Sequence, residues 1–182
     1  MVDMTRYNEA TESLVHQVQS QWLSLPSEFN PKYDMSCMVR DFRSAFCDMR
    51  LRRRVLQRKY EQSRIAHGAY SAGFCGIASY TWNHLFRMPD GEEIWRLKLI
   101  LRNKLHHAWL ENKFTGEPLD LTFDQFVGDD GEYLKIPYDK VGDYNSSDFE
   151  FKRAYTFARR LGIDLGYVVF VNSLRALGRS SR

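Results

Sequence analysis

The chain has 182 residues, of which 43% are hydrophobic and 27% charged, with a formal net charge of +3. This balance supports a buried core within one domain and excludes a chain that is disordered throughout. No run approaches the roughly 20 consecutive apolar residues that span a membrane, and the first six residues lack a signal-peptide pattern. We therefore expect a cytoplasmic protein without a membrane partner, whose three cysteines are reduced: Cys37, Cys47 and Cys75.

The first third of the chain has helical periodicity. Apolar residues recur at helical spacing from Leu14 to Leu25, and Pro26 ends that pattern. A loop is expected over 26–34, which holds two prolines and an asparagine. From about Met35 to Ile65 there is no glycine or proline, which predicts a long helix, either straight or kinked. Residues 1–66 are thus expected to form a helical N-terminal part.

The remainder mixes strand and helix patterns. A glycine-rich stretch at 68–73 precedes a second helical stripe at 77–86, and alternation over 93–102 predicts a strand. Two shorter strands are expected at 106–111 and 118–122. A capping box at 147–150 predicts the start of a helix, and Gly162 is expected to end it. The pattern over 165–177 favours a strand, and residues 179–182 are expected to form a tail. We predict an α+β fold with a single domain over 1–182.

Cys75 stands where the glycine-rich loop enters an apolar helix, between Phe74 and Gly76. Unpaired N–H groups and the dipole at a helix N-terminus stabilise negative charge, so this position favours a thiolate. The flanking glycines let a substrate carbonyl approach the backbone, and the N–H of Cys75 is a candidate oxyanion donor. Cys75 is therefore a candidate nucleophile, with a purely packing role as the alternative.

A histidine and two aspartates follow on the two shorter strands. If a loop at 112–115 joins these strands, His107 lies opposite Asp120 on the same face, and the carboxylate can hold the imidazole. A turn two residues later would place His107 opposite Asp124 instead. Asp120 is thus the first candidate for the third member of a Cys-His-Asp triad, and Asp124 is the reserve.

Trp109 shares the His107 face by strand alternation, where it would shield the triad from water or line a substrate groove. The alternative is a half-buried strand with Trp109 in the core and both histidines at the surface. Cys75, His107 and Asp120 could instead bind a zinc ion, but their spacing in the sequence matches no metal-binding signature. His106 points away from His107 on a strand, so it cannot easily join. We expect no metal and no cofactor.

The order Cys, His, Asp is that of papain-like and transglutaminase-like thiol enzymes, in which a helix presents the cysteine and strands present the other two. More narrowly, the chain resembles the small bacterial YunG-like proteins of this superfamily. The resemblance covers residues 70–126, about a third of the chain, and is carried by Gly73-Phe74-Cys75, His107-Ala108-Trp109 and Asp120-Leu121-Thr122-Phe123-Asp124-Gln125-Phe126.

The resemblance implies a papain-like core over 67–178, with a cysteine-bearing helix packed on a small antiparallel sheet after the N-terminal helices. It implies Cys75 as nucleophile, His107 as base and Asp120 as the residue that orients the base. YunG-like sequences carry glutamine directly before the cysteine, where this chain has Phe74, and no glutamine lies between Gln62 and Cys75. The remaining candidates for oxyanion or substrate contacts are Gly76, Trp109 and Gln125.

A basic run between Arg50 and Arg64 holds seven basic residues against one acid, Glu61. On a single helix, Arg50, Arg54 and Arg58 would share a face with Arg53 beside them, and such a stripe could contact an acidic protein or phosphates. The alternative is a solvated helix face. No zinc-finger or RNA-recognition signature accompanies the run, so nucleic acid is the less favoured partner.

Two functions are therefore expected from the sequence. The first is a cysteine-dependent hydrolase or acyl transferase, of bacterial or phage origin, that acts on an amide, ester or thioester carbonyl, as a protease, deamidase or amidase does. Its partner would be a protein or a small amide or ester substrate. The second is a non-enzymatic binding protein that uses the basic Arg50–Arg64 segment.

Overall fold

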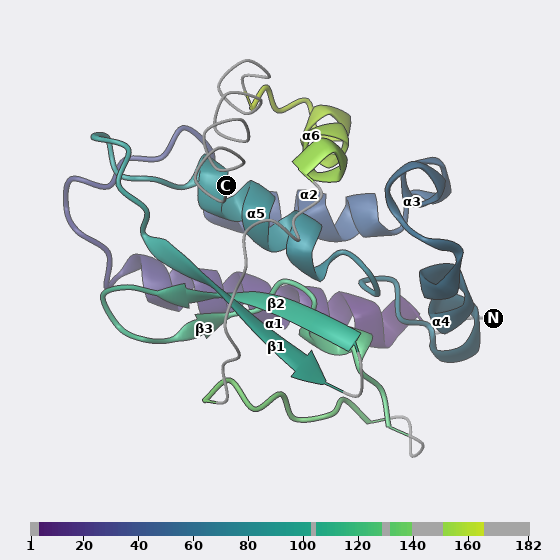
Figure 1. Cartoon of the computed structure of the whole chain (residues 1–182). Coiled ribbons are helices and arrows are strands. Elements are labelled where there is room, and N and C mark those ends of the chain that lie inside the picture. Colours follow the sequence, from purple (N-terminus) through teal and green to yellow (C-terminus); the bar gives the residue numbers. More distant parts are fainter. Residues whose placement is uncertain (1–3, 103–104, 129–131, 140–150, 166–182) are drawn as a thin grey trace, which may run out of the picture.

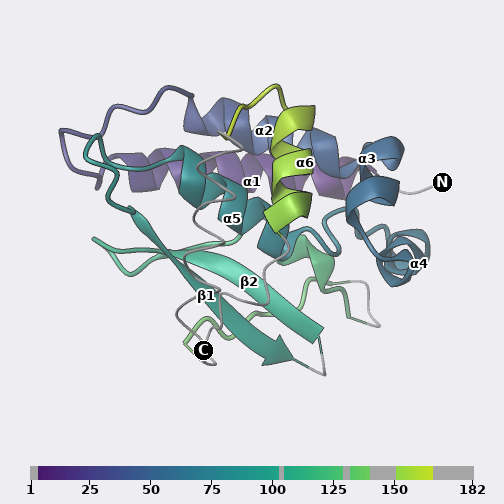
Figure 2. The same ribbon diagram turned by 45° about the horizontal axis from the view of Figure 1, so that its top comes forward.

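The computed structural model of the chain describes residues 4–102, 105–128, 132–139 and 151–165. Within these ranges six α-helices accompany one three-stranded antiparallel sheet, so the α+β class is confirmed. Figures 1 and 2 show the sheet with helix α5 (Cys75–Leu85) running between it and helix α6 (Phe151–Arg160). The papain-like core expected over 67–178 stays a prediction.

The N-terminal part is helical, but the expected long helix is divided into three. Helix α1 (Met4–Trp22) ends before the Pro26 loop, as predicted. The segment from Met35 forms α2 (Met35–Phe46), α3 (Met49–Val55) and α4 (Arg58–His67). Asp48 starts α3 by accepting hydrogen bonds from the N–H groups of Arg50 and Leu51, and Leu56 is extended. The single-helix prediction is wrong because a short polar residue can begin a new helix without glycine or proline.

The sheet has the order β1 (Trp95–Arg102), β2 (Leu105–Asn112) and β3 (Pro118–Leu119). β1 pairs with β2 along its whole length. β3 is only two residues long, where 118–122 was expected, because the chain then turns into a 3-10 helix at Phe123–Gln125. The edge of β2 beyond β3 is consequently left for another element to cover.

Helix α6 ends at Arg160, and Gly162, two residues later, has a φ of 72°, the left-handed conformation expected of a helix stop. The predicted capping box at 147–150, the tail at 179–182, and all but the first residue of the predicted strand at 165–177 lie outside the described residues.

The core is aromatic and joins the helices to the sheet. Trp82 of α5 is fully buried, with its ring centroid 5.9 Å from that of Phe42 on α2 and 6.1 Å from that of Trp95 on β1. Such edge-to-face pairs add to the stabilisation from apolar burial. Helix α5 is thus fixed on both sides, which positions its N-terminus.

None of the described helices combines the length and apolar composition that crossing a membrane requires.

Candidate active site

Cys75 is the first residue of α5, as the sequence predicts, and it is partly exposed. No side chain caps this helix, and its first backbone hydrogen bond runs from Ala78 N to Phe74 O. The N–H groups of the first turn therefore point out of the helix end beside the thiol. Gly76 lies in that turn, so its amide belongs to the same group of donors.

The loop before Cys75 is anchored by a buried arginine. Arg52 of α3 is 1% exposed and donates to the carbonyl oxygens of Phe46 and Tyr70 and to the carboxylate of Glu61. Phe74 is fully buried, and its ring stacks on that of Phe46 with centroids 4.5 Å apart. These contacts fix the backbone on the N-terminal side of the thiol.

Gly73 is required in this loop for two reasons. Its φ is +86°, and a Cβ there would lie 2.6 Å from the Tyr60 ring. We expect Gly73→Ala to lower the free energy of unfolding by about 1–3 kcal/mol and to slow Cys75 alkylation. Gly116→Ala is the matched control, because Gly116 has a φ of +75° with open space around it. Denaturant unfolding and alkylation rates that are the same for both variants would contradict this role of Gly73.

Helix α5 covers the open edge of β2. The N–H of Ala108 donates to the Cys75 sulfur, and the carbonyl of Ala108 accepts from Ser79 Oγ at 3.4 Å. Cys75 and Ser79 are one helical turn apart, so both meet the same strand residue. A backbone N–H aimed at the sulfur stabilises a thiolate. Because this donor is a main-chain group, no sequence pattern predicts it.

His107 lies next to Ala108 on β2 and contacts both of its expected partners. Its side chain is fully buried and hydrogen-bonds the Cys75 thiol. Its Nε2 is 2.6 Å from Oδ2 of Asp120, which is 3% exposed. The structure therefore brings Cys75, His107 and Asp120 into one hydrogen-bonded chain, in which Cys75 is the most exposed residue.

The register behind this contact differs from both expected registers. Leu110 lies opposite Leu119, and Glu111 lies opposite Pro118, midway between the two alternatives. A one-residue slip would have turned Asp120 to the other face, whereas a two-residue difference keeps it on the His107 face. The prediction of direct cross-strand pairing is therefore wrong, while the predicted neighbour of His107 is present.

Asp120 is held by two residues that the sequence analysis did not single out. Its Oδ1 accepts from the N–H of Thr122 at 3.0 Å and from Thr122 Oγ1 at 3.1 Å, while Tyr138 Oη donates to Oδ2 at 3.1 Å. The Asp-x-Thr spacing is an Asx-turn signal that could have indicated Thr122. Nothing in the sequence pattern points to Tyr138.

Asp124, the reserve candidate, has a different partner. Both of its oxygens accept from Arg43 of α2, at 2.6 and 2.7 Å, and the two side chains are 3% and 1% exposed. The carboxylate is committed to a buried bidentate ion pair, so the structure does not offer it to His107. Burial alone would lower the pKa of Arg43, but the charge and hydrogen bond of Asp124, aided by Tyr7 and Tyr133, together raise it.

Gln125 lies directly at the site. Its Nε2 is 2.6 Å from Nδ1 of His107, and its Oε1 accepts from Gly73 N at 3.5 Å. The side-chain amide thus spans from the base to the loop that precedes the nucleophile. In the neutral imidazole, His107 donates through Nε2 to Asp120 and accepts from this amide at Nδ1; in the imidazolium both ring nitrogens are donors, and the amide no longer donates to Nδ1.

The charges at the site favour a thiolate–imidazolium pair. Burial alone would lower the pKa of His107, but the charge and hydrogen bond of Asp120, aided by Cys75, raise it to about 10. Burial alone would raise the pKa of the Cys75 thiol, but the hydrogen bond and charge of His107 outweigh burial and lower it. The charged pair is therefore favoured between the lowered thiol pKa and the raised imidazole pKa.

Aromatic side chains surround the imidazole. Trp109 is fully buried and stacks beside His107 with centroids 6.0 Å apart, and Phe126 meets the ring edge-on at 4.9 Å. Trp109 also contacts Tyr138 at 5.4 Å. Of the two roles expected for Trp109, this burial supports shielding and not the lining of an open groove. Exclusion of water strengthens the ionic interactions of His107.

Other predicted features lie elsewhere. Arg50, Arg53 and Arg54 are exposed on α3, whereas Arg58 begins α4, so the expected common face does not extend to Arg58. The described residues include no group of three His, Cys, Asp or Glu side chains arranged to hold a metal ion. The side chain of His106 lies outside those that the structure describes.

Comparisons of the chain with protein-family models, with curated proteins and with solved structures give no match. The contacts among Cys75, His107, Asp120 and Gln125 are therefore the basis for assigning a function.

Proposed function

We propose that the protein is a cysteine-dependent hydrolase or acyl transferase with a papain-like or transglutaminase-like site, related to the YunG-like proteins. The supporting observation is the chain of contacts from the thiol of Cys75, a partly exposed residue, through buried His107 to Asp120. A nucleophile, a base and a residue that orients the base are the parts that thiol catalysis on carbonyls requires.

In this proposal the Cys75 thiolate attacks the carbonyl carbon of an amide, ester or thioester. The tetrahedral oxyanion is stabilised by the N–H of Cys75 and the side-chain amide of Gln125, which already reaches Gly73 and His107. When the carbon–heteroatom bond breaks, His107 gives its proton to the leaving group and an acyl-thioester on Cys75 remains.

The second half of the reaction releases the acyl group. Water, or an amine in a transferase, attacks the thioester carbonyl while His107 takes its proton, and the thiolate leaves. Asp120 keeps the Nε2–H tautomer in place and stabilises the imidazolium formed at each step.

The test is acylation of the protein by a panel of activated amide, ester and thioester substrates. We expect one acyl group per chain, located on Cys75 by peptide mass spectrometry, and none after Cys75→Ala. His107→Ala should reduce turnover by about a hundredfold or more, because it removes the general base. Labelling spread over Cys37 and Cys47, or turnover unchanged in His107→Ala, would contradict the proposal.

A further inference from the structure

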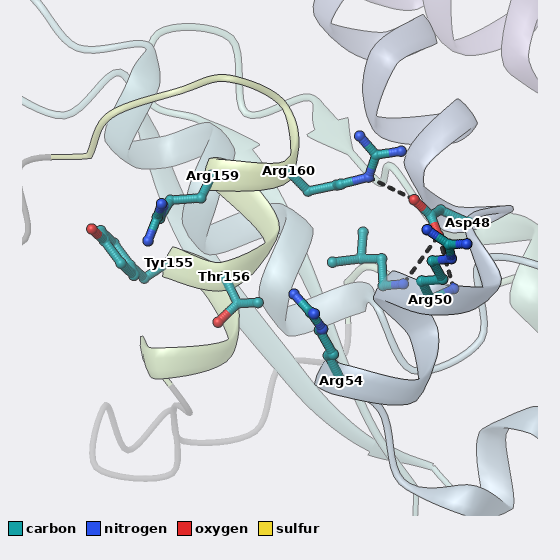
Figure 3. Close-up of a pocket in the computed structure, with 8 residues that line it drawn as sticks. Asp48, Arg50, Arg54, Tyr155, Thr156, Arg159 and Arg160 are labelled. Atoms are coloured by element: carbon teal, nitrogen blue, oxygen red, sulfur yellow. Dashed lines mark hydrogen bonds and ion pairs between the residues drawn. The ribbon is translucent and has the colours of Figure 1, made fainter.

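A second site lies between α3 and α6. This cavity, which we call the arginine pocket, has a volume of about 680 Å³. Figure 3 shows the residues that line it. The lining residues that matter here are Asp48, Arg50, Arg54, Tyr155, Arg159 and Arg160. None of the residues that line it belongs to the Cys75–His107–Asp120 chain, so the pocket has no part in the proposed hydrolysis.

The pocket carries an excess of positive charge. Four arginines face one carboxylate, and that carboxylate is already occupied: Asp48 accepts from the N–H groups of Arg50 and Leu51 and from Arg160 Nε at 2.6 Å. The hydrogen bond from Arg160, with those from the backbone, lowers the pKa of Asp48, so it stays ionised. Within the described part of the chain, no acidic side chain pairs with the guanidinium groups of Arg50, Arg54 or Arg159.

The arginines come from both helices. Arg50 and Arg54 are one turn apart on α3. In Figure 3, Arg54 extends from α3 toward α6 and Arg160 extends from α6 toward Asp48, whereas Arg159 extends toward Tyr155, away from Arg54. The ion pair between Arg160 and Asp48 joins the two helices at one end of the pocket.

This chemistry suits phosphate groups. A guanidinium can make two parallel hydrogen bonds to a phosphate, and several of them together match a ligand with several negative charges. The volume falls in the range typical of small-molecule sites, roughly 300–1,000 Å³. We propose that the arginine pocket binds a small molecule that carries two or more phosphate groups.

An extended nucleic acid fits the surroundings less well. Arg52 is buried and bonded to Glu61, and Arg64 also bonds Glu61, so these two basic residues are not presented to a phosphate backbone. The break between α3 and α4 further interrupts the run. The basic residues between Arg50 and Arg64 therefore do not present one continuous stripe to a phosphate backbone.

The test is isothermal titration calorimetry of the full chain with tripolyphosphate, with ATP and with a single-stranded oligonucleotide. We expect saturable binding of tripolyphosphate and ATP, weakened about tenfold or more by Arg54→Ala and by Arg159→Ala, because each loses a charge-assisted hydrogen bond. Arg53→Ala is the matched control, since Arg53 is exposed on the same helix but does not line the pocket. All three variants change exposed side chains, and circular dichroism verifies that they remain folded.

Three outcomes would overturn the inference: absence of tripolyphosphate binding, an equal loss of affinity in Arg53→Ala, or binding of the oligonucleotide that tripolyphosphate does not displace. The last result would assign the surface to nucleic acid. Cys75→Ala should leave the affinity for tripolyphosphate unchanged. Failure of the hydrolase proposal and failure of this one are therefore distinguishable.

Discussion

Replacement of Arg43 with methionine should lower the free energy of unfolding by about 3–5 kcal/mol, because it leaves the buried carboxylate of Asp124 without a counter-charge. Arg43 also donates to Thr11 Oγ1 at 3.1 Å and to the carbonyl oxygen of Leu121 at 3.4 Å, and its guanidinium lies 3.8 Å from the Tyr7 ring centroid. It therefore joins α1 and α2 to the segment that carries Asp120 and Gln125.

Arg40→Met is the matched control for this prediction. Arg40 lies on the same helix and pairs with Glu12, but both side chains are about half exposed, at 49% and 52%. Such exposed pairs contribute only about 0–1 kcal/mol. Equilibrium denaturation in urea measures the free energy of unfolding of both variants. Equal losses would show that the buried Arg43–Asp124 pair contributes no more to stability than the exposed Arg40–Glu12 pair.

Replacement of Asp120 with asparagine should reduce the alkylation rate of Cys75 at neutral pH by about ten- to a thousandfold, the range that loss of a close counter-charge implies. Asparagine can still accept a hydrogen bond from His107, but it supplies no charge. Burial then lowers the pKa of His107, less imidazolium faces the sulfur, and the pKa of Cys75 rises.

Asp139→Asn removes the same charge from an exposed position next to Tyr138, and it serves as the control. Its alkylation rate should match that of the unmodified protein. If Asp120→Asn remains folded by near-ultraviolet circular dichroism and alkylates as fast as Asp139→Asn, the charge of Asp120 does not support the thiolate.

The parts of the site that the sequence predicts are those set by local patterns. The helix start at Cys75 follows from a glycine-rich loop before an apolar stripe, and the shared face of His107, Trp109 and Asp120 follows from strand alternation. An error of two residues in the register leaves these side chains on the same face of the sheet, because successive side chains of a strand alternate between its two faces.

Long-range contacts were not predictable from such patterns. The Arg43–Asp124 pair joins residues 81 positions apart, and the N–H of Ala108 reaches Cys75 only because β3 stops at Leu119. The expected helix from Met35 to Ile65 is divided at Asp48, whose capping role depends on where the chain turns. In each case the tertiary structure determines which partner a polar group meets.

The most direct test of the central claim, a thiolate at Cys75 sustained by His107, is the pH dependence of alkylation by iodoacetamide, followed at each cysteine by mass spectrometry. Cys37 and Cys47 are internal controls, because the Asp34 side chain raises the pKa of the first and burial raises that of the second. We predict that Cys75 reacts below neutral pH. Its alkylation rate should rise as the pH passes the lowered pKa of the thiol and then stay constant up to about pH 10. His107→Ala should abolish the reactivity at low pH. A Cys75 that titrates near the ordinary thiol value of about 8.5, or whose profile is unchanged in His107→Ala, would contradict the account.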